Sequence, residues 1–73
     1  MELENLEYGV VRQYDEFKNC GTIERDHGRG ELFFMPQDVP RIARTSLQSG
    51  DRVKFFIVVC RKGQKAVRVR PVN

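Results

Sequence analysis

The apolar residues of this chain occur in short runs, many of them alternating with polar residues, and clusters of Gly and polar residues separate the runs. The apolar spacing of about 3.6 residues that an amphipathic helix requires does not continue beyond two helical turns anywhere in the sequence. Alternation with a period of two residues is typical of strands that bury one face. The sequence therefore predicts an all-β domain.

Five segments have the composition and alternation of strands. The predicted strands are Glu7–Tyr14, Cys20–Arg25, Glu31–Met35, Arg52–Cys60 and Lys65–Arg70. The connections DEFKN, DHGRG, QSGD and RKGQ each supply Asn, Asp or Gly, which favour chain reversal. Residues 36–50 are different, because two prolines exclude a central strand there, and we expect a helical turn or a long loop.

The alternation also predicts which side chains share a face. In the fourth predicted strand, one face has Val53, Phe55, Ile57 and Val59, and the other has Lys54, Phe56, Val58 and Cys60. In the fifth, one face has Val67 and Val69, and the other has Arg68 and Arg70. A strand with two largely apolar faces suits a small closed barrel, because curvature brings neighbouring elements over both of its sides.

A chain of 73 residues is long enough for one compact core and too short for two. We expect an N-terminal extension at residues 1–6 and a single domain at residues 7–73. No apolar run approaches the roughly 20 residues of a membrane span, and the acidic start MELENLE is unlike the basic start of a signal peptide. The expected location is therefore intracellular, in the cytoplasm, without membrane contact.

Residues suited to metal binding or catalysis are sparse. Cys20, Cys60 and His27 do not form the close ligand pairs of a structural zinc site, so we predict no metal and no cofactor. A disulfide between the two cysteines is geometrically possible, but buried reduced thiols better fit a chain without secretory features. The sequence has no recognisable nucleophile, carboxylate-pair or nucleotide-binding motif, and we predict that the protein is not an enzyme.

Positive charge is concentrated at the C-terminal end. Residues 51–73 have seven basic side chains and one acidic side chain, a net charge of +6, whereas residues 1–50 have six basic and nine acidic side chains, a net charge of −3. The basic segment could bind a polyanion. The alternative is that Lys and Arg merely occupy the solvated face of two strands, where they prevent pairing between exposed edges.

The order of residues along the chain resembles that of a cold-shock domain. GVVRQYDEFKNCGTI, residues 9–23, aligns without a gap on the opening pattern of that family, G-x-V-K-W-F-N-x-x-K-G-Y/F-G-F-I. ELFFMP aligns on D-V-F-V-H-F, LQSGDRVKF on L-x-x-G-x-x-V-x-F, and AVRVRPV on A-x-N-V-x-x. The resemblance implies a five-stranded antiparallel OB-fold barrel that binds single-stranded nucleic acid.

The differences from that family are concentrated where its members stack bases. Five of the stacking positions have lost their rings, and they hold Gln13, Cys20, Thr22, Met35 and Pro36. Phe33 alone keeps a ring. Each stacked base contributes roughly 1–3 kcal/mol to binding, so the loss predicts weak binding in which electrostatic attraction is the main source of affinity.

Seven residues are the candidates for contact with nucleic acid. They are Arg12, Tyr14, Lys18, Phe33, Met35, Arg61 and Lys62. By the resemblance, Phe33 faces the ligand while Leu32 and Phe34 face inward; the alternative is that Phe33 is a core residue. The basic members would contact phosphates and Met35 would offer a flexible apolar contact, although each of these side chains also suits an ordinary strand surface.

Two aromatic residues near the first turn have more than one interpretation. We expect Tyr14 to be half-buried, with its hydroxyl group in water. The resemblance places Phe17 in a solvent-facing loop, where it either folds over the rim of the barrel, which we favour, or forms an exposed anchor.

The expected function is weak binding of single-stranded RNA, rather than DNA, by an auxiliary module of a larger RNA-associated protein. Non-standard domains of this kind occur in multi-cold-shock-domain translational regulators of the Unr type, which the chain resembles. The alternative is a protein-interaction or spacer module that has lost nucleic-acid binding. In that case the ring-depleted face, with Cys20, Thr22, Met35 and Pro36, and with Phe17 if it forms an exposed anchor, would contact a protein partner.

Overall fold

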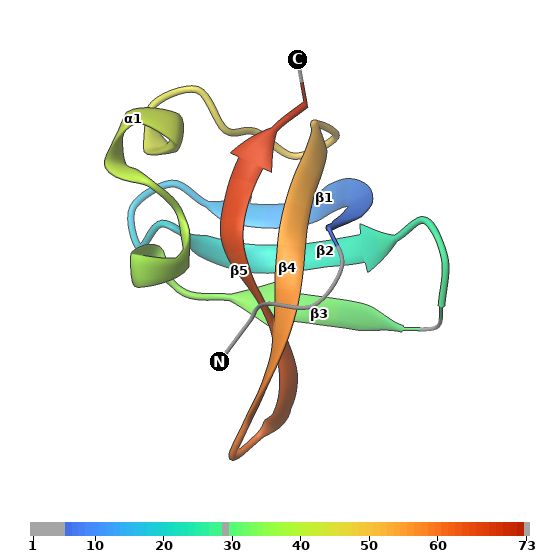
Figure 1. Ribbon diagram of the computed structural model, residues 1–73. Coiled ribbons are helices and arrows are strands. Elements are labelled where there is room, and N and C mark those ends of the chain that lie inside the picture. The colour runs from blue at the N-terminus through green and yellow to red at the C-terminus, as the bar shows by residue number, and fades with distance from the viewer. Residues whose placement is uncertain (1–5, 29, 73) are drawn as a thin grey trace.

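Five strands form a closed barrel in the order β1-β2-β3-β5-β4 in the computed structural model, which describes residues 6–28 and 30–72 (Figure 1). The strands are β1 (Glu7–Asp15), β2 (Cys20–Arg25), β3 (Glu31–Phe34), β4 (Arg52–Cys60) and β5 (Gly63–Pro71). The predicted all-β OB-fold barrel is confirmed, and each predicted strand end lies within two residues of the observed one. The predicted extension at residues 1–6, apart from Leu6, lies outside the described residues.

The barrel consists of two layers that cross. The antiparallel strands β1, β2 and β3 form one layer, and the antiparallel hairpin of β4 and β5 runs across it at a steep angle (Figure 1). The layers join through an antiparallel pairing of β1 with β4 and through a parallel contact in which Phe33 of β3 lies opposite Lys65 of β5. This parallel contact is the exception to the antiparallel arrangement.

Side chains from both layers meet in one hydrophobic core. The buried residues are Val11, Ile23, Leu32, Phe34, Val39, Ala43, Leu47, Val53, Phe55, Ile57, Ala66 and Val69. Three of them come from the connection between β3 and β4, which contains the 3-10 helix η1 (Pro36–Asp38) and the short helix α1 (Arg41–Arg44). The predicted helical turn within residues 36–50 is therefore confirmed, and this segment adds apolar side chains to the barrel core.

A bulge in β5 places one valine on the opposite face of the strand from the predicted one. Phe56 pairs with Val67 and Lys54 pairs with Arg70, so the single residue between them on β4 lies opposite two residues of β5. The extra residue is Arg68, whose φ angle of 54° is in the left-handed region. Ala66 and Val69 are consequently buried, whereas Val67 is half-buried on the outer side, so the prediction that Val67 shares the face of Val69 is wrong.

The far end of the β4–β5 hairpin also differs from the predicted alternation. Val53, Phe55 and Ile57 are buried as predicted, but Val59 is 79% exposed. The reason is that the hairpin extends beyond the barrel, where no other strand covers it (Figure 1). Cys60 lies at the same end; it and Cys20 are half-buried free cysteines, so the prediction of full burial is wrong.

The turn between β1 and β2 is held by its own side chains. The Asp15 carboxylate accepts hydrogen bonds from the backbone N–H groups of Phe17 and Lys18 at 2.9 and 3.1 Å, and Asn19 adopts a φ angle of 57°. The Tyr14 hydroxyl donates to Asn19 Oδ1 at 2.8 Å, so it is not simply solvated as predicted. Phe17 is 93% exposed, and the favoured prediction that it folds over the rim is wrong.

Arg68→Asn should raise the free energy of unfolding by about 0.5–1 kcal/mol, because Asn tolerates the left-handed backbone region better than Arg does. Urea unfolding followed by circular dichroism measures this change. Arg70→Asn is the matched control, since Arg70 is also exposed on β5 and lacks a positive φ angle. An Arg68→Asn variant that is no more stable than Arg70→Asn would contradict the expected strain.

Burial raises the pKa of the Tyr14 hydroxyl above its usual value of 10.0, and nearby Arg44 opposes this shift only in part. The stability that Tyr14 contributes is therefore fully present below pH 10.0 and is lost as the pH rises through the folded-state pKa. In a Tyr8→Phe variant, Tyr14 is the only remaining tyrosine. We expect its tyrosinate absorbance to titrate at higher pH in the folded protein than in urea; equal midpoints would contradict the burial effect.

Candidate nucleic-acid interface

The outer surface of the first layer brings several of the predicted stacking positions side by side. We call Gln13, Cys20, Thr22, Phe33 and Met35 the β1–β3 face. Thr22 lies opposite Gln13 on one side and opposite Phe33 on the other, so these three residues form one row across the layer. Because Ile23, Leu32 and Phe34, the strand neighbours of Thr22 and Phe33, point into the core, this row points outward.

Phe33 is the one aromatic side chain of the β1–β3 face. Leu32 and Phe34 are 4% and 0% exposed, whereas Phe33 is half-buried on the opposite side of β3, so its predicted orientation is confirmed. Met35, immediately after β3, is 40% exposed. The Thr22 hydroxyl oxygen is buried and makes no hydrogen bond with a described residue, so this position adds little polar character to the face. The available stacking surface is therefore one ring with a flexible thioether beside it.

The charge of Arg12 is offset by two carboxylates. Arg12 is the extra residue of a bulge in β1, between Val11 and Gln13, and its guanidinium lies 3.1 Å from Glu24 Oε1 and 3.8 Å from Glu31 Oε2. Glu24 and Glu31 are directly opposite each other in the β2–β3 register, where two like charges repel unless a cation lies between them. Arg12 thus stabilises this pair, and the three side chains together have a net negative charge that disfavours a nearby phosphate.

A buried ion pair at the seam of the barrel was not predicted. Lys65 Nζ lies 3.2 Å from Asp38 Oδ2, and the Asp38 residue is 7% exposed. The same carboxylate oxygen accepts a hydrogen bond from the backbone N–H of Met35 at 2.9 Å. Asp38 therefore holds the end of β3 against β5, next to Phe33. The sequence signal was an Asp three residues after Met35, which is the spacing of a helix cap.

The remaining candidate residues do not join the β1–β3 face. The Tyr14 ring packs against Phe34, with 6.1 Å between the ring centroids, so it belongs to the rim of the core. Lys18 is exposed in the β1–β2 turn. Arg61 and Lys62 are exposed at the tip of the β4–β5 hairpin, at the end of the hairpin that extends beyond the barrel (Figure 1).

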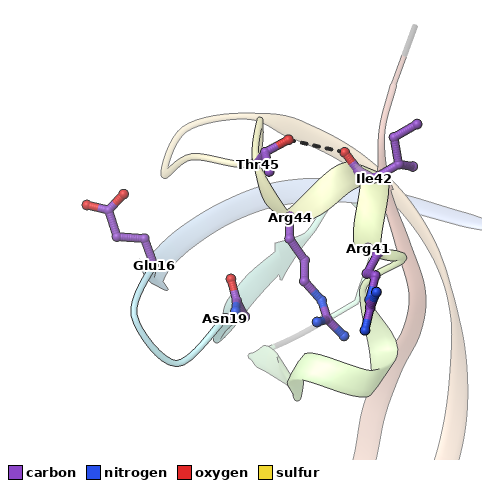
Figure 2. A pocket seen from close by; sticks show the side chains of 6 residues that line it. All are labelled: Glu16, Asn19, Arg41, Ile42, Arg44 and Thr45. Carbon is purple, nitrogen blue, oxygen red and sulfur yellow. Dashed lines mark hydrogen bonds between the residues drawn. The ribbon is translucent and has the colours of Figure 1, made fainter.

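An open pocket lies between the β1–β2 turn and α1 (Figure 2). Its lining residues are Glu16, Asn19, Arg41, Ile42, Arg44 and Thr45. Arg44 donates hydrogen bonds to the carbonyl oxygens of Pro36 and Val39 at 2.6 and 3.1 Å, so its guanidinium holds the connecting segment together. Ile42 points away from the two arginines and is 86% exposed (Figure 2). The pocket is open to the surface, and two of its lining residues are arginines.

Among residues 6–28 and 30–72, no group of three His, Cys, Asp or Glu side chains is placed to hold a metal ion. The helices of those residues are too short and too polar to cross a membrane.

Comparison with known proteins agrees with the geometry of the barrel. Residues 7–72 match a family model described as the 'Cold-shock' DNA-binding domain. A search of curated proteins finds no match. The matched range starts at the first residue of β1 and contains all five strands, and its family binds nucleic acid. The chain therefore belongs to the cold-shock domain family.

Proposed function

We propose that this domain binds single-stranded nucleic acid weakly and mainly through electrostatic attraction, and that it prefers RNA to DNA. It would act in the cytoplasm as an auxiliary module of a larger RNA-associated protein that regulates translation, similar to non-standard domains of Unr-type proteins. Membership of the cold-shock domain family supports the ligand class. The observation that supports weak binding is that the β1–β3 face has one half-buried ring, Phe33, beside an Arg12 whose charge is offset.

The number of rings limits the energy that base stacking can contribute to binding. Base stacking contributes roughly 1–3 kcal/mol per ring, whereas micromolar affinity requires about 8 kcal/mol. Phe33 alone therefore supplies a minor share, and Met35 adds an apolar contact without a stacking plane. Most of the remaining binding energy has to come from contacts between cations and phosphates, which weaken as the salt concentration rises.

Exposed cations are available for such contacts. Lys18, Arg61 and Lys62 are exposed and form no ion pair with a described residue. Electrostatic binding of this kind has little sequence preference and low affinity. It becomes useful when neighbouring modules hold the nucleic acid nearby, because tethering raises its effective concentration at the weak site.

A second candidate function is the binding of a protein partner. Two large apolar side chains near the pocket of Figure 2 are exposed, Phe17 at 93% and Ile42 at 86%. They extend from the β1–β2 turn and from α1, which are the elements that line this pocket. If a protein partner covers both side chains, the domain acts as an interaction or spacer module. This function requires no contact between nucleic acid and Phe33.

Titration of a labelled oligouridylate of roughly ten nucleotides tests the proposed function. We expect Phe33→Leu, which keeps an apolar side chain and removes the ring, to weaken binding about fivefold at low salt, since about 1 kcal/mol of stacking is lost. Phe33→Trp is the matched control, and it should bind at least as tightly as the wild type. An oligothymidylate of the same length should bind more weakly than the RNA.

The same titration separates the two candidate functions. Wild-type affinity should fall steeply between low and high salt, and the amide resonances of β1, β2 and β3 should shift when RNA is added. Absence of binding at low salt would exclude the nucleic-acid function. Shifts restricted to Phe17 and Ile42 as the protein concentration rises would instead favour a protein-binding surface.

A further inference from the structure

The outer surface of the second layer, together with the adjoining start of β1, combines cations with aromatic rings. We call Tyr8, Lys54, Phe56, Arg68 and Arg70 the β4–β5 face. In the strand register, Lys54 lies opposite Tyr8 of β1 on one side and opposite Arg70 of β5 on the other. Phe56 is two residues further along β4, and its side chain therefore lies on the same face as Lys54.

This surface is on the other side of the barrel from the β1–β3 face. Val53, Phe55 and Ile57 of β4 point into the core, as do Ala66 and Val69 of β5. The core lies between the two crossing layers, so the side chains of β4 and β5 that point away from it are on the opposite side of the molecule from the β1–β3 face (Figure 1). Tyr8, near the start of β1, lies beside Lys54 where the two layers join. A nucleic-acid strand bound to the β4–β5 face would not need to contact Phe33.

The cations of the β4–β5 face are not offset by carboxylates. Arg52 is ion-paired with Asp26 at 2.7 Å and Lys65 with Asp38 at 3.2 Å, so these two basic residues are already neutralised. Lys54, Arg68 and Arg70, in contrast, form no ion pair with any described residue. Strands β4 and β5 contain no Asp or Glu. Three of the seven basic residues of the segment 51–73 are therefore unpaired on this surface.

Two rings lie among these cations. Tyr8 is 40% exposed and Phe56 is half-buried. Tyr8 faces Lys54, and Phe56 is the diagonal neighbour of Tyr8 across the β1–β4 pairing, a separation that aromatic side chains can span. Rings interleaved with unpaired cations are typical of surfaces that bind single strands, because bases stack on the rings while phosphates contact the cations. A partner that was only acidic would make no use of the rings.

The backbone at Arg68 supports a functional interpretation of this surface. Its φ angle of 54° is unfavourable for Arg and is tolerated better by Asn or Gly. A strained residue that keeps a long cationic side chain on an exposed bulge is explained when that side chain contacts a ligand.

We propose that the β4–β5 face is a second binding surface for single-stranded nucleic acid. Lys54, Arg68 and Arg70 contact phosphates, and Tyr8 and Phe56 stack on bases. The ligand class rests on the proposed function, whereas the location of the surface rests on the register, the ion pairs and the exposed rings. Nucleic acid would thus contact both sides of the barrel, with the stronger electrostatic contribution on the β4–β5 side.

A charge-matched pair of double variants tests the location. The first, Lys54→Gln with Arg70→Gln, removes two unpaired cations; the control, Arg25→Gln with Arg52→Gln, removes two cations that are ion-paired with Glu7 and Asp26. Both variants lose the same net charge. For the labelled oligouridylate, the slope of log Kd against log salt concentration should fall by about 1.4 in the first variant, since each phosphate contact on a single strand contributes about 0.7. The control should keep the wild-type slope.

A ring-specific variant distinguishes nucleic acid from other polyanions. Phe56→Leu should weaken binding of the oligouridylate at least about fivefold and leave the salt slope unchanged, because stacking is lost while the cations remain. Addition of RNA to the wild type should shift the amide resonances of residues 54–58 and 67–70. Polyglutamate of equal charge should compete poorly. Circular dichroism confirms that each variant is folded before its affinity is measured.

The possible results separate this inference from the proposed function. Suppose that the wild type binds RNA and that Phe33→Leu weakens binding, but that the double variant of Lys54 and Arg70 has the same salt slope as its control. The inference of a second binding surface is then wrong, and the proposed function remains. If polyglutamate competes as well as RNA and Phe56→Leu has no effect, the surface binds acidic polypeptides, and the inference is overturned. If the wild type does not bind RNA at low salt, both are wrong.

Discussion

The shared core between two crossing layers is the constraint on which the rest of this structure depends. Phe34 from β3 and Phe55 from β4 are both fully buried in it, and they are the largest such side chains among the described residues. A chain this short buries only about 60% of its unfolded surface, so each strand has to commit one face to the core. The other face of each layer then remains outside. The β1–β3 face and the β4–β5 face are the direct result.

The ion pairs decide which of these outer faces attracts a polyanion. Arg12 is held between Glu24 and Glu31 on the first layer, and Lys65 is paired with the buried Asp38 at the seam. These pairs hold strands in register but remove positive charge from the region around Phe33. Lys54 and Arg70, opposite each other on the second layer, have no such partner among the described residues. Charge counted along the sequence therefore differs from the charge that a ligand meets on each face.

The strands and turns of the domain could be predicted because they depend on residues that are close together in the sequence. The alternation of β2 and β4 fixes their bounds, and Asn19 suits a turn residue with positive φ. Gly21, which matches the family pattern, lies where a side chain would overlap the backbone of Gln13 in the neighbouring strand. The orientation of Phe33 followed from the same alternation. The predicted side-chain faces were wrong in two places. The bulge at Arg68 interrupts the alternation of β5, and Val59 lies where β4 extends beyond the barrel.

By itself, the sequence determined the strand count, the turn positions and the single core, because these depend on residue type and short spacing. Only the tertiary structure decided that Tyr14 joins the rim of the core, that Phe17 is exposed and that Glu24 and Glu31 offset Arg12. It also decided that Tyr8 and Phe56 share a surface with three cations. Cross-strand register and bulges bring distant residues together, and one added residue reverses the face of those that follow it.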